Sequence, residues 1–170
     1  VMLRSSFERT GEPAGLAELG SFLVIGSGAA GCVAAGLAAD RLGRTAITSA
    51  AMAISGACCL AVGFFYGGSA AALLLLAALW GATVVADSAQ FSACVTELAD
   101  PRYVGTALTL QTSIGFLLTT ASIALVPAAV ESLGWRWAFV VLAPGPALGT
   151  LAMLRLRALP EAARIAEGRR

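Results

Sequence analysis

Long stretches without a charged side chain are the feature that most restricts how this sequence can fold. The charge-free runs cover residues 19–39, 45–86, 103–130 and 137–154. An α-helix needs about 20 apolar residues to cross the hydrocarbon core of a bilayer. The second run is long enough for two crossings, and Gly67 and Gly68 offer a turn that divides it. The sequence therefore predicts an all-α polytopic membrane protein with five spans, at residues 19–39, 45–65, 69–95, 103–130 and 137–154.

The composition supports a membrane protein and argues against several other classes. Hydrophobic residues make up 58% of the chain and charged residues only 12%, whereas soluble domains carry about 25% charged residues. There is no histidine and no basic stripe, so we expect no nucleic-acid partner, no metal, no cofactor and no enzymatic activity. The cysteines lie inside apolar spans at spacings that suit neither zinc nor a disulfide framework, and we interpret them as small packing residues: Cys32, Cys58, Cys59 and Cys94.

The distribution of arginine predicts the orientation of the spans. If the turn that holds Arg41 and Arg44 is cytoplasmic and the spans alternate, most other arginines also fall inside, namely Arg102, Arg155, Arg157, Arg164, Arg169 and Arg170. Only Arg4, Arg9 and Arg136 then fall outside. Because short cytoplasmic loops are enriched in basic residues, we expect a cytoplasmic C-terminus in the cell membrane, as in a bacterial inner membrane.

Both ends of the chain are polar. Residues 1–18 contain Gly11 and Pro13, and they are predicted to form an external segment after a missing helix that ended near residues 1–3. Residues 158–170 are predicted to be a short cytoplasmic tail. The odd number of spans and the absence of an initial methionine suggest that the chain is a fragment of a longer protein.

The segment GLAADRLGRT, residues 36–45, joins the first two spans. Its glycines and charges are Gly36, Asp40, Arg41, Gly43 and Arg44. At these positions the chain resembles the major facilitator superfamily of secondary transporters, whose signature loop has the order glycine, three residues, aspartate, arginine, any residue, glycine, arginine. Thr45 departs from the basic residue that usually follows. A chance aspartate in a basic loop is the alternative explanation.

The resemblance implies a role for this loop. In the superfamily the loop latches the cytoplasmic side of two six-helix halves and helps set the outward-open state. By this resemblance Asp40 is the latch carboxylate, Arg41 and Arg44 form cytoplasmic ion pairs, and Glu97 is a candidate partner. The resemblance covers residues 1–157, which fit helices eight to twelve of a twelve-helix transporter. Helices two to six are the second choice. In many members of the superfamily the fourth helix carries an embedded arginine, and in antiporters the fifth helix carries a glycine–proline motif. The third and fourth spans of this chain, which would correspond to those helices, lack both features.

Polar side chains inside the third and fourth spans are candidates for a transport pathway. Asp87 and Gln90 are predicted to share a helical face with Cys94 and Glu97, although Asp87 is also placed close enough to the inner boundary to be interfacial. Gln111 is the candidate from the fourth span, because an amide in lipid is costly unless it is paired. In the fifth span, residues 144–146 read Pro-Gly-Pro and should break the helix.

Glycines in the first span match a dinucleotide-binding fingerprint at Gly26, Gly28 and Gly31. That fold needs an acidic residue about 20 positions later, and residues 46–55 contain none. An oxidoreductase is therefore the weak alternative, and we interpret the glycines as a face for close helix packing.

The main functional hypothesis is transport of a small solute by alternating access, coupled to protons or to another solute, with the missing N-terminal half and the lipid bilayer as partners. A membrane subunit without transport activity is the second hypothesis. The substrate and the direction of transport are left open.

Overall fold

The computed structural model describes residues 1–168, and within them all regular structure is helical. The α-helices are α1 (Met2–Thr10), α2 (Ala14–Leu42), α3 (Arg44–Phe65), α4 (Ala70–Leu98), α5 (Val104–Leu133) and α6 (Pro144–Ala158). Two 3₁₀ segments, η1 (Ala138–Leu142) and η2 (Pro160–Gly168), precede and follow α6. Arg169 and Arg170, which the sequence analysis placed on the cytoplasmic side, lie outside the described residues.

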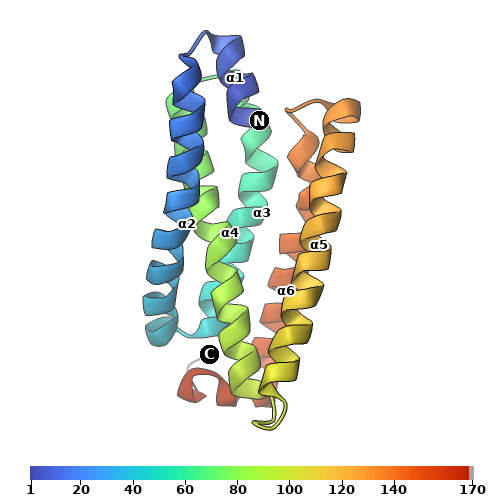
Figure 1. Cartoon of the computed structure of the whole chain (residues 1–170). Coiled ribbons are helices and arrows are strands. Elements are labelled where there is room, and N and C mark those ends of the chain that lie inside the picture. Colours follow the sequence, from blue (N-terminus) through green and yellow to red (C-terminus); the bar gives the residue numbers. More distant parts are fainter. Residues whose placement is uncertain (169–170) are drawn as a thin grey trace.

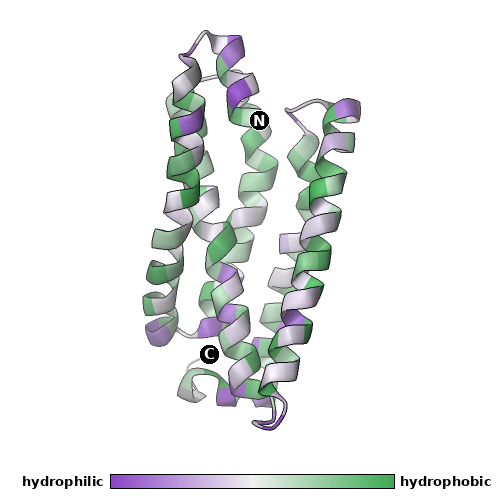
Figure 2. Cartoon of the chain, in the orientation of Figure 1, coloured by the Kyte–Doolittle hydropathy of each residue, from purple (hydrophilic) through white to green (hydrophobic). Residues whose placement is uncertain are grey.

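Five helical segments are long and apolar enough to cross a membrane, as the sequence predicts. They are Gly15–Leu42, Arg44–Phe65, Ala70–Leu98, Val104–Leu133 and Ala138–Ala158. Figure 2 shows hydrophobic residues along the spans and the most hydrophilic residues mainly near the turns. Large apolar side chains on α5 face outward, and Leu110 is 61% exposed and Leu117 70% exposed. A surface of this kind is stable in lipid or against a protein partner, and the chain is an integral membrane protein.

In the bundle, α3 and α4 lie between α2 on one side and α5 with α6 on the other (Figure 1). α2 packs along α4, and α3 packs against both α4 and α6. α5 contacts mainly η1, and it makes few contacts with α4. The turn between α2 and α3, the turn between α4 and α5, and the C-terminal segment η2 all lie at one end of the bundle, opposite α1.

The predicted external segment contains a helix, α1, and part of this helix is buried. Phe7 is 1% exposed and packs in a core cluster with Leu73 and Val62. Gly11, with φ 74°, ends α1 in the left-handed conformation, where glycine is favoured. The Ser5 and Tyr66 hydroxyls are 2.8 Å apart, and Gly67 N donates to Ser6 Oγ at 2.9 Å. α1 is therefore fixed to the α3–α4 turn.

The C-terminal segment also differs from the predicted polar tail. Ala162 and Ile165 of η2 are fully buried in a second core cluster, together with Met52, Cys94 and Met153. The predicted break at Pro144 is present, because α6 begins there and η1 makes up the earlier part of the span. Pro127 lies inside α5, which continues through it.

Candidate functional site

The turn between α2 and α3 consists of Gly43 alone. Its backbone has φ 96° and ψ 138°, a region that a residue with a side chain rarely adopts. Gly43 N donates to Ala39 O at 3.0 Å, and Gly43 O accepts from Ile47 N at 3.2 Å. The last turn of one helix is thus bonded directly to the first turn of the next. This arrangement brings Asp40 and Arg44 together across the junction.

Arg44 is the centre of a group of polar side chains that we call the Arg44 cluster: Asp40, Arg44, Gln90 and Glu97. Arg44 Nε donates to Glu97 Oε1 at 3.0 Å, and Arg44 Nη1 donates to Gln90 Oε1 at 3.4 Å. Arg44 Nη2 lies 3.6 Å from Asp40 Oδ1. The Arg44 and Glu97 side chains are only 20% and 26% exposed, so water screens their attraction less than it screens a surface pair. The cluster joins the ends of α2, α3 and α4.

Glu97 also binds the C-terminal segment. Its second oxygen, Oε2, accepts a hydrogen bond from Ala166 N at 2.9 Å. Ala166 has φ 47°, in the left-handed region that non-glycine residues adopt rarely. Sequence reasoning did not find this contact, because a backbone amide leaves no signal in the side-chain pattern. One carboxylate therefore connects α3, α4 and η2.

A polar cavity of about 480 Å³ lies between α4 and α5. From α4 it is lined by Asp87, Ser88, Phe91 and Ser92. From α5 it is lined by Gln111, Thr112, Ile114, Gly115, Phe116, Leu118 and Thr119. Gln111 Nε2 donates to Ser92 Oγ at 3.4 Å, and Ser88 Oγ donates to Asp87 Oδ1 at 3.2 Å. The cavity brings two of the predicted pathway residues, Asp87 and Gln111, to one site.

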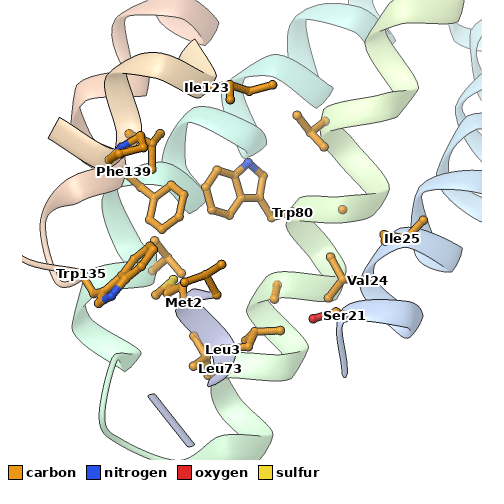
Figure 3. A pocket seen from close by; sticks show the side chains of 17 residues that line it. Met2, Leu3, Ser21, Val24, Ile25, Leu73, Trp80, Ile123, Trp135 and Phe139 are labelled. Atoms are coloured by element: carbon orange, nitrogen blue, oxygen red, sulfur yellow. The ribbon is translucent and has the colours of Figure 1, made fainter. Parts of the chain in front are cut away.

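An apolar cavity of about 600 Å³ lies toward the other end of the bundle. Figure 3 shows the rings of Trp80, Trp135 and Phe139 on one side and Val24 with Ile25 on the other. Trp80 and Phe139 meet edge to face, with ring centroids 5.4 Å apart. Trp80 Nε1 donates to Ser55 Oγ at 3.1 Å, so its one polar group is bonded within the protein. Trp80 and Val84 line this cavity, and Asp87 and Phe91 line the polar one, at steps of three and four on one face of α4.

The comparison with family models gives one match. The model described as Major Facilitator Superfamily matches residues 3–170. The chain belongs to the major facilitator superfamily. No curated protein and no solved structure shows a significant match to the chain. The superfamily is one of transporters that move small solutes across a lipid bilayer, so the match agrees with the resemblance found at residues 36–44.

The residues of the signature loop differ in their exposure and in their contacts. Gly43 and Arg44 are central to the turn, and Asp40 is paired across it at an exposed position. Arg41 is exposed on the surface of α2. A Cβ at Gly36 would meet no atom within 4 Å, so Gly36 is not a close-packing point in the described residues.

The predicted pathway residues separate into two sites. Asp87 and Gln111 lie at the polar cavity. Gln90 is 3% exposed and contacts Arg44 instead. Two residues of the predicted helical face therefore have different neighbours, because Gln90 lies on the α3 side of α4 while Asp87 lies on the α5 side.

The glycines of α2 behave as packing residues at two of the three predicted positions. A Cβ at Gly31 would overlap the backbone of Ala82, and one at Gly28 would lie 3.2 Å from Gly81 O. Ser27 Oγ donates to Ala78 O at 2.8 Å across the same contact. Gly26 points away, and a Cβ there would meet nothing within 4 Å. The α4 contact follows residues 24, 27, 28 and 31 and does not include Gly26, so a packing role for Gly26 stays a prediction.

The turn between α4 and α5 carries a separate, exposed ion pair. Arg102 Nη2 lies 2.9 Å from Asp100 Oδ2, and Arg102 N donates to Asp100 Oδ1 at 2.9 Å. The Arg102 guanidinium, followed by the Arg102 backbone amide, lowers the pKa of Asp100 below its ordinary value of 3.8. Stabilisation from this pair is present above that ordinary value and is lost as the pH falls through the lowered pKa. Asp100 is a useful control for the carboxylates of the two sites.

Proposed function

We propose that this chain is most of the C-terminal half of a secondary transporter, covering helices eight to twelve. The complete transporter would move a small solute by alternating access between two helical halves. The sequence has no G-x-x-x-x-G-K-[ST] phosphate-binding loop. We therefore propose that a proton or solute gradient drives transport.

The observation that carries the proposal is the Arg44 cluster at the single-residue turn. Ion pairs that close one end of a helical half can be made in one conformation and broken in the other, which is how a contact biases a two-state equilibrium. Arg44 and Glu97 supply such a pair between α3 and α4, and Asp40 adds a carboxylate on the exposed side. In our proposal Asp40 is the group that engages the missing half.

The arginine distribution supports a cytoplasmic location for this end of the bundle. Arg41 and Arg44 lie at the α2–α3 turn, Arg102 at the α4–α5 turn, and Arg155 and Arg157 in the last turn of α6. These turns lie at the same end (Figure 1). By the positive-inside rule this end faces the cytoplasm.

Two measurements test the proposal. The first is the reading frame upstream of Val1, where we expect six or seven further spans and a second Asp-Arg-Gly-Arg loop. A soluble domain there would contradict the half-transporter assignment. The second is uptake of a mixed panel of labelled solutes by proteoliposomes that contain the complete gene product. Failure to move any cationic, anionic or neutral solute, in either direction and with any imposed ion gradient, would favour a subunit without transport activity.

A further inference from the structure

We propose that the polar cavity between α4 and α5 is the recognition site for a small organic cation that carries N–H donors next to an apolar or aromatic group. The inference rests on the proposed transport function and deepens it by naming a substrate class. It depends on three properties of the cavity wall: which hydrogen-bonding groups are free, which charge is present, and which apolar surfaces adjoin them.

Gln111 leaves an acceptor unused. Its Nε2 donates to Ser92 Oγ at 3.4 Å, while its Oε1 is buried and has no hydrogen-bond partner among the described residues. The orientation of the amide is fixed, because Ser92 Oγ donates its own hydrogen to Ser88 O at 3.3 Å and so can only accept from Gln111. A buried acceptor without a donor is costly, and a ligand N–H that displaces the atoms now covering Oε1 would satisfy it.

The hydroxyl groups of the wall use their hydrogens internally. Ser88 Oγ donates to Asp87 Oδ1, Ser92 Oγ donates to Ser88 O, and Thr119 Oγ1 donates to Gly115 O at 2.9 Å. Thr112 is the remaining hydroxyl of the lining. The groups left for a ligand are therefore mainly acceptors: the Asp87 carboxylate, Gln111 Oε1 and the lone pairs of the hydroxyls. Such a wall favours a ligand rich in donors.

Asp87 supplies a negative charge without a protein counter-charge in this half. Among residues 1–168, it is the only charged side chain that lines the cavity, and no arginine side chain lies within ion-pair distance of it. A carboxylate inside a membrane span needs a partner or a polar cavity. A cationic ligand would provide the partner, whereas an anion would be repelled at short range.

The apolar part of the ligand has a place beside these acceptors. Phe91 and Phe116 line the same cavity, and aromatic faces attract ammonium groups as well as apolar rings. The volume of about 480 Å³ is within the range of small-molecule sites. Val84 and Trp80 continue the same face of α4 into the apolar cavity, so a longer apolar substituent would extend in that direction.

The test is equilibrium binding to the complete gene product in nanodiscs, with three probes that share one phenyl group: phenethylammonium, 2-phenylethanol and 3-phenylpropionate. We expect saturable binding of phenethylammonium and at least about ten-fold weaker binding of the other two, since a hydrogen-bonded charge pair is worth about that factor or more. Asp87→Asn should weaken phenethylammonium binding by about ten-fold or more. Asp87→Glu, which keeps the charge, should restore most of it and shows that the loss is not a folding defect.

Matched variants separate the cavity from other polar positions. Gln111→Leu should weaken phenethylammonium binding several-fold, while Thr109→Val, an exposed change on the same helix, should leave it unchanged. Asp100→Asn removes an exposed carboxylate outside the cavity and should also have no effect.

The proposal is overturned if the alcohol or the carboxylate binds as tightly as the ammonium probe. It is also overturned if Asp87→Asn leaves the affinity unchanged, or if phenethylammonium does not bind at all. These outcomes differ from failure of the proposed function. A protein that transports an anion or a neutral solute, with Asp87→Asn fully active, keeps the transport function and loses the cation assignment. A protein that binds the ammonium probe through Asp87 but moves no solute keeps the cation assignment and loses the transport function.

Discussion

Arg44 and Glu97 are separated by 53 residues in sequence, and the Arg44 Nε donates to Glu97 Oε1 at 3.0 Å. The same carboxylate accepts Ala166 N at 2.9 Å through its other oxygen. Glu97 is therefore a three-way connection between the start of α3, the end of α4 and the C-terminal segment η2. Because both oxygens are in use, removing the carboxylate takes one partner from Arg44 and one from Ala166 N at the same time.

We expect a double-mutant cycle between Arg44 and Glu97 to give a clear coupling. With Arg44→Ala, Glu97→Ala and the double variant, the coupling in the free energy of unfolding should be about 1–3 kcal/mol, because the pair is mostly buried and hydrogen-bonded. Thermal unfolding in detergent measures it. The matched cycle between Asp100 and Arg102 should show a much smaller coupling, because water screens this more exposed pair. Equal couplings in the two cycles would contradict the special role of Glu97.

The C-terminal segment should be a stable part of the bundle. Ile165 is fully buried against Met153 and Cys94, so Ile165→Ala should lower the free energy of unfolding by about 2–4 kcal/mol. Leu159→Ala is the control, because Leu159 is 49% exposed and its truncation removes little packing. Limited proteolysis should cut after residue 158 faster in the Ile165 variant. Indistinguishable stabilities for the two variants would mean that η2 is not docked.

The sequence predicts the membrane spans but not the packing of the two ends of the chain. The five spans, their order and the break at Pro144 follow from local properties: runs without charge, glycines at turns and the geometry of proline. The burial of Phe7, Ala162 and Ile165 depends on contacts with distant helices, and each of them has a charged residue beside it in sequence. Local composition therefore predicted a polar external segment and a polar tail, but it gave no sign of the helix α1 or of the packed 3₁₀ segment η2.

The site residues also fall into two groups: those that a local motif identifies, and those whose surroundings depend on how the helices pack. The turn residues from Asp40 to Arg44 could be recognised because a fixed local pattern identifies them. Helical spacing alone placed Asp87 and Gln90 on one face, but α4 has a neighbour on each side of that face. Gln90 lies on the α3 side and Asp87 on the α5 side. Only the packing of three helices decides this, and no single-helix pattern contains it.

Gly31 and Gly26 form a matched test of the α2–α4 contact. Gly31→Ala should destabilise the protein by about 1–3 kcal/mol, because its Cβ would overlap the Ala82 backbone. Gly26→Ala should be neutral or stabilising by up to about 1 kcal/mol, because alanine is the better helix former and its Cβ has open space. Thermal unfolding in detergent compares the two. Bound flavin or nicotinamide in the purified protein would instead revive the dinucleotide interpretation of these glycines.

Asp40 should matter for transport far more than for stability. Its pairing with Arg44 spans one helical turn at 3.6 Å, and its side chain is 64% exposed. Pairs of this kind contribute about 0.3–0.5 kcal/mol, so Asp40→Asn should leave the thermal unfolding of the complete transporter nearly unchanged. If Asp40 biases the equilibrium between the two conformations, its loss should still lower the uptake rate by about five-fold or more.

The readout for Asp40→Asn is initial uptake rate in proteoliposomes, normalised to the amount of inserted protein. Asp100→Asn is the control for a carboxylate at the same end of the bundle, and it should transport normally. Normal uptake by Asp40→Asn would remove the latch role from this residue. Loss of uptake together with a large loss of thermal stability would point to a structural role instead. The proposed latch requires the combination of impaired uptake and unchanged stability, because a switch contact acts on the balance between two folded states rather than on folding itself.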